Sequence, residues 1–190
     1  MASFRVLRRL DFYPRTVNVL TLCTGNAARS VMLGYMLETV AKTEGWSWQI
    51  RTAGTHVSEG QGISARTRDA IMAIEELSHH PVTQHRSHQL NDDDCEWADV
   101  IVTAEADHVR YVRARHPQAA PFTVSVGALL RHSPLAGDLA DRVRAVSAVD
   151  LDDALDVADP AGKDQEAYDA CAQELWDMSL AVAVLLGPDA

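Results

Sequence analysis

Residues 16–30 read TVNVLTLCTGNAARS, and the periodicity of the chain changes within this stretch. Thr16 to Cys23 is a run of apolar and β-branched residues that ends at a Gly-Asn pair, which is typical of a buried β-strand. From Arg29 to Thr43 the apolar residues recur at helical spacing instead. The stretch therefore predicts a strand, a tight loop and a helix in direct succession.

The same alternation continues to the end of the chain. Three more strand patterns follow, at 46–52, 99–104 and 121–126. Helical patterns lie between and after them: one capped by Ser64, one at 105–116, two short ones within 129–149, and a long one from about Asp164. Strands that alternate with helices favour right-handed crossovers and a parallel, doubly wound α/β sheet, in which ligands bind beyond the carboxyl ends of the strands. Cys23 stands at such an end.

The loop after the first strand has the features of an anion-binding site. A strand that enters a tight loop and then a helix directs successive backbone N–H groups to one place, at the positive end of the helix dipole. Small residues allow the loop to curl closely, and Asn26 tolerates the left-handed conformation that a bend requires. We predict an oxyanion cradle formed by Thr24, Gly25, Asn26, Ala27, Ala28, Arg29 and Ser30.

Cys23 and Arg29 would act on the bound oxyanion from opposite sides. The positive potential of the cradle favours the thiolate of Cys23, which is the nucleophilic form. The planar guanidinium of Arg29 is suited to bind two oxygens of a tetrahedral anion, and the hydroxyl of Ser30 can donate a hydrogen bond to the sulfur. The structural alternative is that Cys23 is a buried strand residue and Arg29 an ordinary helix charge.

Expulsion of an alkoxide or phenoxide also requires a proton donor. Asp159 precedes Pro160 and the closing helix, and the proline biases Asp159 toward an extended conformation that projects its carboxyl group outward. A positioned carboxylic acid contributes roughly 10²- to 10⁴-fold to such a reaction. We predict Asp159 as the general acid, with a turn or helix cap as the alternative role.

Composition excludes several other functions. The chain of 190 residues has 27 acidic and 17 basic residues and a formal charge of −10, which argues against nucleic-acid binding. It contains no apolar run long enough to span a membrane. Its three separated cysteines predict a reducing cytoplasm rather than a disulfide framework. The four histidines between His79 and His88 lack the spacing of a zinc site, so we predict a solvated loop there and no metal.

These residues resemble the low-molecular-weight protein tyrosine phosphatase family from about Val17 to Leu186. Its pattern C-x-G-N-x-x-R-S matches 23–30, its small-residue turn resembles 52–55, its aspartate-bearing strand resembles 98–103, and its Asp-Pro resembles 159–160. The resemblance implies a four-stranded parallel sheet of flavodoxin-like topology and a phosphatase domain at 17–190 after an N-terminal extension, residues 1–16. It also implies a phosphocysteine on Cys23, phosphoryl binding by Arg29, Asp159 as acid and then base, and no cofactor or metal.

The chain departs from the family at the walls of the site. Ala28 replaces a protective second cysteine, and His56-Val57-Ser58 and Ala161-Gly162 stand where eukaryotic-type members have aromatic residues. The segment 129–155 is longer than in compact members. The expected substrate is therefore a phosphotyrosine protein or a small phosphomonoester, with a thiol-dependent arsenate reductase and a non-catalytic phosphate-binding module as alternatives. Neither the oligomeric state nor the physiological substrate follows from the sequence.

Overall fold

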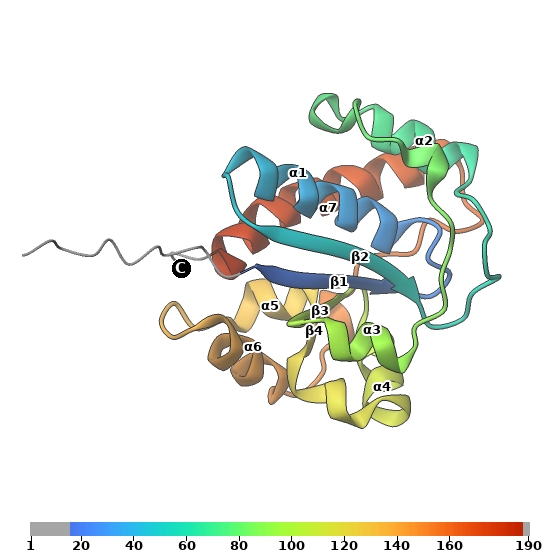
Figure 1. The fold of residues 1–190 in the computed structure, drawn as a ribbon. Helices are drawn as coiled ribbons and strands as arrows, with labels where there is room; N and C mark the ends of the chain where they lie inside the picture. The colour runs from blue at the N-terminus through green and yellow to red at the C-terminus, as the bar shows by residue number, and fades with distance from the viewer. Residues whose placement is uncertain (1–15, 188–190) are drawn as a thin grey trace, which may run out of the picture.

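The computed structural model describes residues 16–187, which form one four-stranded sheet with helices on both faces (Figure 1). The strands are all parallel, in the order β2-β1-β3-β4, and comprise β1 (Val17–Cys23), β2 (Trp48–Gly54), β3 (Val100–Thr103) and β4 (Thr123–Ser125). The helices are α1 (Arg29–Thr43), α2 (Ala65–Met72), α3 (Asp92–Trp97), α4 (Ala106–Arg115), α5 (Val126–His132), α6 (Leu139–Ser147) and α7 (Gln165–Leu186). The predicted parallel α/β sheet of flavodoxin-like topology is confirmed.

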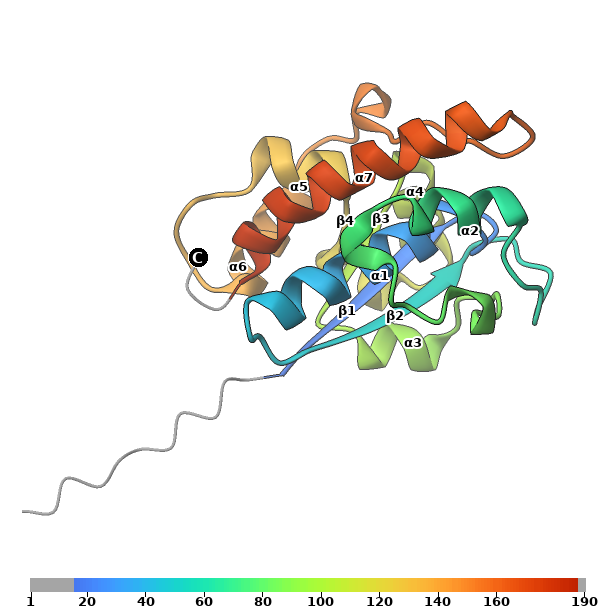
Figure 2. The same ribbon diagram turned by 90° about the horizontal axis from the view of Figure 1, so that it is seen from above.

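The strands β1, β2 and β3 contribute to two separate hydrophobic cores because successive side chains point to opposite faces of the sheet. Val19 and Val102 belong to the core that includes residues of α1, α5 and α7. Leu20 and Ile101 belong to the other core, which includes residues of α3 and α4. Within the first core, α1 and α7 lie side by side, as Figures 1 and 2 show. The two cores hold the sheet rigidly between two helical layers.

The carboxyl ends of the strands bring distant loops to one edge of the sheet. Cys23, at the end of β1, lies opposite Gly54 at the end of β2. The segment before α7 joins the same edge, since the N–H of Val157 donates to the carbonyl of Ala104 at 3.0 Å. The loops after β1, β2 and β3 and the Asp-Pro segment therefore meet in space.

Several predicted boundaries were wrong by two or three residues. The second strand begins at Trp48 and includes Ala53 and Gly54, because its parallel register with β1 extends to Cys23. The fourth strand is short, since residues 117–122 form a 3₁₀ helix and Val126 already begins α5. The predicted helix capped by Ser64 ends at Met72, and a separate 3₁₀ turn at Glu75–Leu77 follows it.

The helices of residues 16–187 include none with the length and apolar character needed to cross a bilayer. The predicted N-terminal extension lies outside the described residues except for Thr16.

Candidate active site

The loop between β1 and α1 presents a row of free backbone donors. None of the hydrogen bonds formed within residues 16–187 uses the N–H of residues 24–28 as its donor. Ala28 stands at the N-cap position of α1 and no side chain caps this helix. By contrast, side chains cap other α-helices at Ser64, Asn91, Ser125, Asp138 and Asp164. The first turn of α1 and the loop before it are thus open to an anion.

Asn26 fixes the shape of this loop. Its backbone has φ of 50°, in the left-handed region, and its side chain is fully buried. The side-chain amide nitrogen donates to the hydroxyls of Ser30 (3.0 Å) and Thr52 (2.8 Å), and its oxygen accepts the N–H of His88 at 2.8 Å. The bend that the sequence predicted at Asn26 is therefore held from three sides.

Cys23 lies at the base of the loop with its sulfur 3.0 Å from the hydroxyl oxygen of Ser30. The Asn26 amide nitrogen can only donate to this hydroxyl, so the Ser30 hydrogen is free to point at the sulfur. A donated hydrogen bond stabilises the thiolate more than the thiol. The side chain of Cys23 is 3% exposed, so a reacting group must reach it through the mouth of the loop.

Arg29 joins the loop to the Asp-Pro segment. Its guanidinium is 2% exposed, and it donates to the Val157 carbonyl at 3.0 Å and to the Asp159 carboxylate at 2.7 Å. A second carboxylate, that of Glu105, forms an ion pair with it at 2.5 Å. The structure thus brings Cys23, Arg29 and Asp159 together from positions up to 136 residues apart in sequence numbering.

Glu105 and His108 were not found in the sequence as site residues. His108 accepts the Glu105 N–H on Nδ1 at 3.1 Å, so in the neutral ring the proton is on Nε2, which lies 3.0 Å from the Thr24 hydroxyl. Burial, assisted by the nearby Arg29, lowers the pKa of His108 to about 4. A neutral imidazole therefore orients Thr24 at neutral pH. The available signal was a glutamate and a histidine three residues apart, just after the end of a predicted strand.

The predicted solvated histidine loop was wrong in part, because two of its residues support the cradle. His85 Nε2 and the Ser87 hydroxyl both lie 2.8 Å from the Asn26 carbonyl oxygen, and burial lowers the pKa of His85. His80 instead contacts Thr39 on α1. Within residues 16–187 no three His, Cys, Asp or Glu side chains converge in an arrangement that would hold a metal ion.

The other two cysteines are structural. Cys95 and Cys171 are free, buried thiols on α3 and α7. Burial raises the pKa of Cys95 to about 11 and that of Cys171 to about 12. Cys171 belongs to the hydrophobic core that includes residues of α1. Neither thiol has the low pKa of a reactive cysteine.

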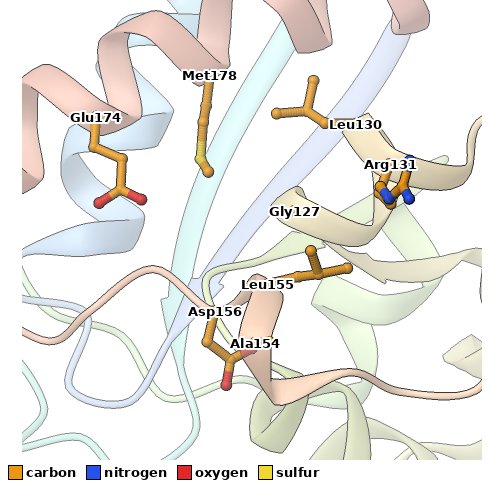
Figure 3. Close-up of a pocket in the computed structure, with 8 residues that line it drawn as sticks. All are labelled: Gly127, Leu130, Arg131, Ala154, Leu155, Asp156, Glu174 and Met178. Carbon is orange, nitrogen blue, oxygen red and sulfur yellow. The ribbon is translucent and has the colours of Figure 1, made fainter.

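A cavity of about 340 Å³ lies between α5, α7 and residues 154–156 (Figure 3). Figure 3 shows Met178 and Leu155 pointing into it, with Glu174 and Arg131 on opposite sides. Asp156 forms part of its wall and also accepts the N–H of Ala106 at 2.7 Å. The cavity contains none of the predicted site residues, so it is separate from the cradle.

The sequence is similar to those of known phosphatases. The family "low molecular weight phosphotyrosine protein phosphatase" matches residues 18–126, more than half of the chain. A protein-arginine-phosphatase from Geobacillus stearothermophilus is 28% identical over 123 residues, which are 65% of this chain and 76% of that protein.

Solved structures of other proteins share the fold of this chain. The low-molecular-weight protein tyrosine phosphatase from T. tengcongensis has a TM-score of 0.70 at 22% identity, covering 87% of this chain and 97% of that one. The YwlE arginine phosphatase from Geobacillus stearothermophilus has a TM-score of 0.66 at 25% identity, covering 88% and 90%.

Proposed function

Because the chain belongs to the low molecular weight phosphotyrosine protein phosphatase family, we propose that it removes phosphoryl groups from protein side chains through a phosphocysteine on Cys23. The convergence of Cys23, Arg29 and Asp159 on the uncapped start of α1 is the observation that carries the proposal. We take 24–30 as the phosphoryl-binding residues and 17–190 as the phosphatase domain, preceded by residues 1–16. The cytoplasm is the proposed location, since all three cysteines are free thiols.

In the first step the Cys23 thiolate attacks phosphorus and the bond from phosphorus to the leaving oxygen breaks. In phosphoarginine a guanidine nitrogen takes the place of this oxygen and receives the proton. The free N–H groups of residues 24–28 and the Arg29 guanidinium bind the three other phosphoryl oxygens. Asp159 transfers its proton to the leaving oxygen. The products are a phosphocysteine and the free hydroxyl compound.

In the second step water attacks the phosphocysteine, with Asp159 removing its proton, and the bond from sulfur to phosphorus breaks. Inorganic phosphate leaves and the Cys23 thiolate is restored, with the donated Ser30 hydrogen bond stabilising it as the leaving group. Atoms and charges balance without any added oxidant or metal.

Arg29 links substrate binding to the release of the Asp159 side chain. Its donors are engaged by Val157, Asp159 and Glu105. A phosphoryl dianion that binds the guanidinium replaces the Asp159 carboxylate at 2.7 Å. Asp159, whose side chain is 41% exposed, then takes up a proton from solvent and turns toward the leaving group as the acid. Glu105 remains paired with the guanidinium.

Phosphotyrosine is the first candidate substrate, because the family is described as a phosphotyrosine phosphatase family. Phosphoarginine is the second, because the 28% identical relative is named a protein-arginine-phosphatase and because two carboxylates, Asp159 and Glu105, lie beside the cradle. A cationic guanidinium leaving group would be attracted to them. Small phosphomonoesters would bind through the cradle alone.

The test is stopped-flow hydrolysis of p-nitrophenyl phosphate by the wild type, Cys23→Ser and Asp159→Asn, followed by initial rates on phosphotyrosine and phosphoarginine peptides. We expect a burst and steady turnover that disappear in Cys23→Ser, and a loss in Asp159→Asn that grows as the leaving group becomes more basic. A leaving-group-independent loss would remove Asp159 from the acid role.

The two other functions have distinct signatures in the same experiment. Arsenate-dependent thiol consumption through Cys23 without phosphatase turnover would indicate an arsenate reductase. Stoichiometric phosphate binding without any burst would indicate a binding module. Buried Cys95 and Cys171, with raised pKa values, offer no resolving thiol for the disulfide form of arsenate reduction.

A further inference from the structure

A groove of about 590 Å³ lies beside the cradle, between the loop after β2, residues 89–90 and α4. The backbone connects it directly to the site, because the N–H of His56 in its wall donates to the Thr24 carbonyl at 2.9 Å. Tyr111 and Arg115 of α4 line it from the other side. A substrate bound in the cradle therefore has this groove as a neighbour.

One face of α4 runs from the cradle along the groove. His108, Tyr111 and Arg115 are spaced by three and four residues, so they share that face. His108 contacts Thr24 of the cradle at 3.0 Å, while Tyr111 and Arg115 line the groove. At a rise of 1.5 Å per residue, Arg115 stands about 10 Å along the helix from His108.

Arg115 is the cation of this face that has no partner. It is exposed, and it forms no hydrogen bond or ion pair within residues 16–187. The other two arginines of α4 are engaged: Arg110 pairs with Asp107 and Asp153, both at 2.7 Å, and Arg113 donates to the Ser147 carbonyl at 2.7 Å. Arg115 thus keeps its donors for a ligand.

The carboxylates that border the groove are already bound by other groups. Asp92 accepts from His116 at 2.7 Å and from Gln118 at 3.1 Å. Glu59 pairs with His88 and accepts the N–H of Gln89. Neither carboxylate is paired with Arg115.

We propose that this groove binds the segment of a phosphoprotein next to the phosphorylated residue, and that Arg115 binds an acidic side chain of that segment. The proposal rests on the phosphatase function given above. An extended chain advances about 3.3 Å per residue, so the distance of about 10 Å places the acidic side chain three residues from the phosphorylated one. The Tyr111 ring, which lies against His56 with centroids 5.5 Å apart, offers an apolar surface to the residues between.

The test compares nine-residue peptides that carry, three residues before or after the phosphorylated one, glutamate, glutamine or lysine. The phosphorylated residue is whichever of phosphotyrosine and phosphoarginine the enzyme hydrolyses. We expect the wild type to show a KM about threefold lower for the glutamate peptide on one side, with equal kcat, and the preference to weaken at high salt.

Variants assign the preference to one side chain. Arg115→Ala should abolish it and Arg115→Glu should reverse it toward lysine, while both keep wild-type turnover of p-nitrophenyl phosphate. Arg113→Ala is the matched control, since it removes an exposed arginine from the same helix outside the groove. Equal KM values for the glutamate and glutamine peptides in the wild type, or a preference that survives in Arg115→Ala, would overturn the proposal.

The two proposals fail separately. Turnover of p-nitrophenyl phosphate that depends on Cys23 supports the phosphatase function regardless of the peptide results. Its absence would refute that function, and with it the groove proposal, whereas normal turnover without a preference for the acidic peptide refutes only the groove.

Discussion

The buried His108 should make the protein sensitive to acid well above the range in which its carboxylates titrate. Burial and the adjacent Arg29 lower the pKa of His108 from 6.5 to about 4. In the unfolded chain His108 therefore binds a proton near pH 6.5, whereas in the folded protein it binds that proton only near pH 4. The free energy of unfolding is at its full value above pH 6.5 and falls as the pH drops through this interval.

The size of the effect follows from the shift. Each pKa unit corresponds to 1.36 kcal/mol, so the change from 6.5 to about 4 amounts to about 3 kcal/mol, of which about 2 kcal/mol is lost by pH 5. Because the His108 side chain is only 3% exposed, solvent screening reduces this value little. A loss of this size is a substantial part of the roughly 5–15 kcal/mol that stabilises a typical domain.

Urea unfolding at pH 7, 6 and 5 measures this loss in the wild type and in His108→Asn. Asparagine retains an acceptor for the Glu105 N–H at the position of Nδ1 and does not titrate, but it is too short to replace the contact of Nε2 with the Thr24 hydroxyl, so only the pH dependence of the two proteins is compared. The variant should lose about 2 kcal/mol less than the wild type between pH 7 and pH 5. His80 and His85, whose pKa values burial also lowers, contribute equally to both proteins. Parallel losses in the two proteins would refute the reasoning.

Three further substitutions test the scaffold of the site. Asn26→Ala places an alanine at φ 50° and leaves the buried N–H of His88 without its acceptor. The free energy of unfolding, measured with urea, should fall by about 2–4 kcal/mol, and turnover should fall as well. Full stability in the variant would show that the loop holds its bend without this side chain. Gly127→Ala places a β-carbon against the Leu155 carbonyl. Thermal unfolding should therefore show a lower Tm, and steady-state kinetics should show a lower kcat. Unchanged values of both would mean that α5 and residues 153–155 do not pack tightly in solution. Glu105→Gln removes a carboxylate that competes for Arg29, so inorganic phosphate should inhibit several-fold more strongly, and weaker inhibition would show that Glu105 mainly orients the guanidinium.

The local sequence pattern was sufficient to predict the helix and strand that flank the cradle. The helix from Arg29 to Thr43 was predicted with its bounds, because helical spacing begins directly after the small-residue loop. The second strand was placed two residues early, because its limits are set by pairing with β1 rather than by its own composition. Pairing partners lie far away in sequence, so such limits cannot be recognised from local periodicity.

The sequence by itself determined the alternation of strands and helices, the Cys23 to Arg29 loop and the identity of Asp159 as a candidate, because each depends on neighbours within a few residues. Only the tertiary structure decided that Arg29 contacts both Asp159 and Glu105, and that a histidine loop supports Asn26. These contacts join residues 59 to 130 positions apart. They form because parallel strands carry their following loops to one edge of the sheet, and only the packed sheet sets which of those loops touch.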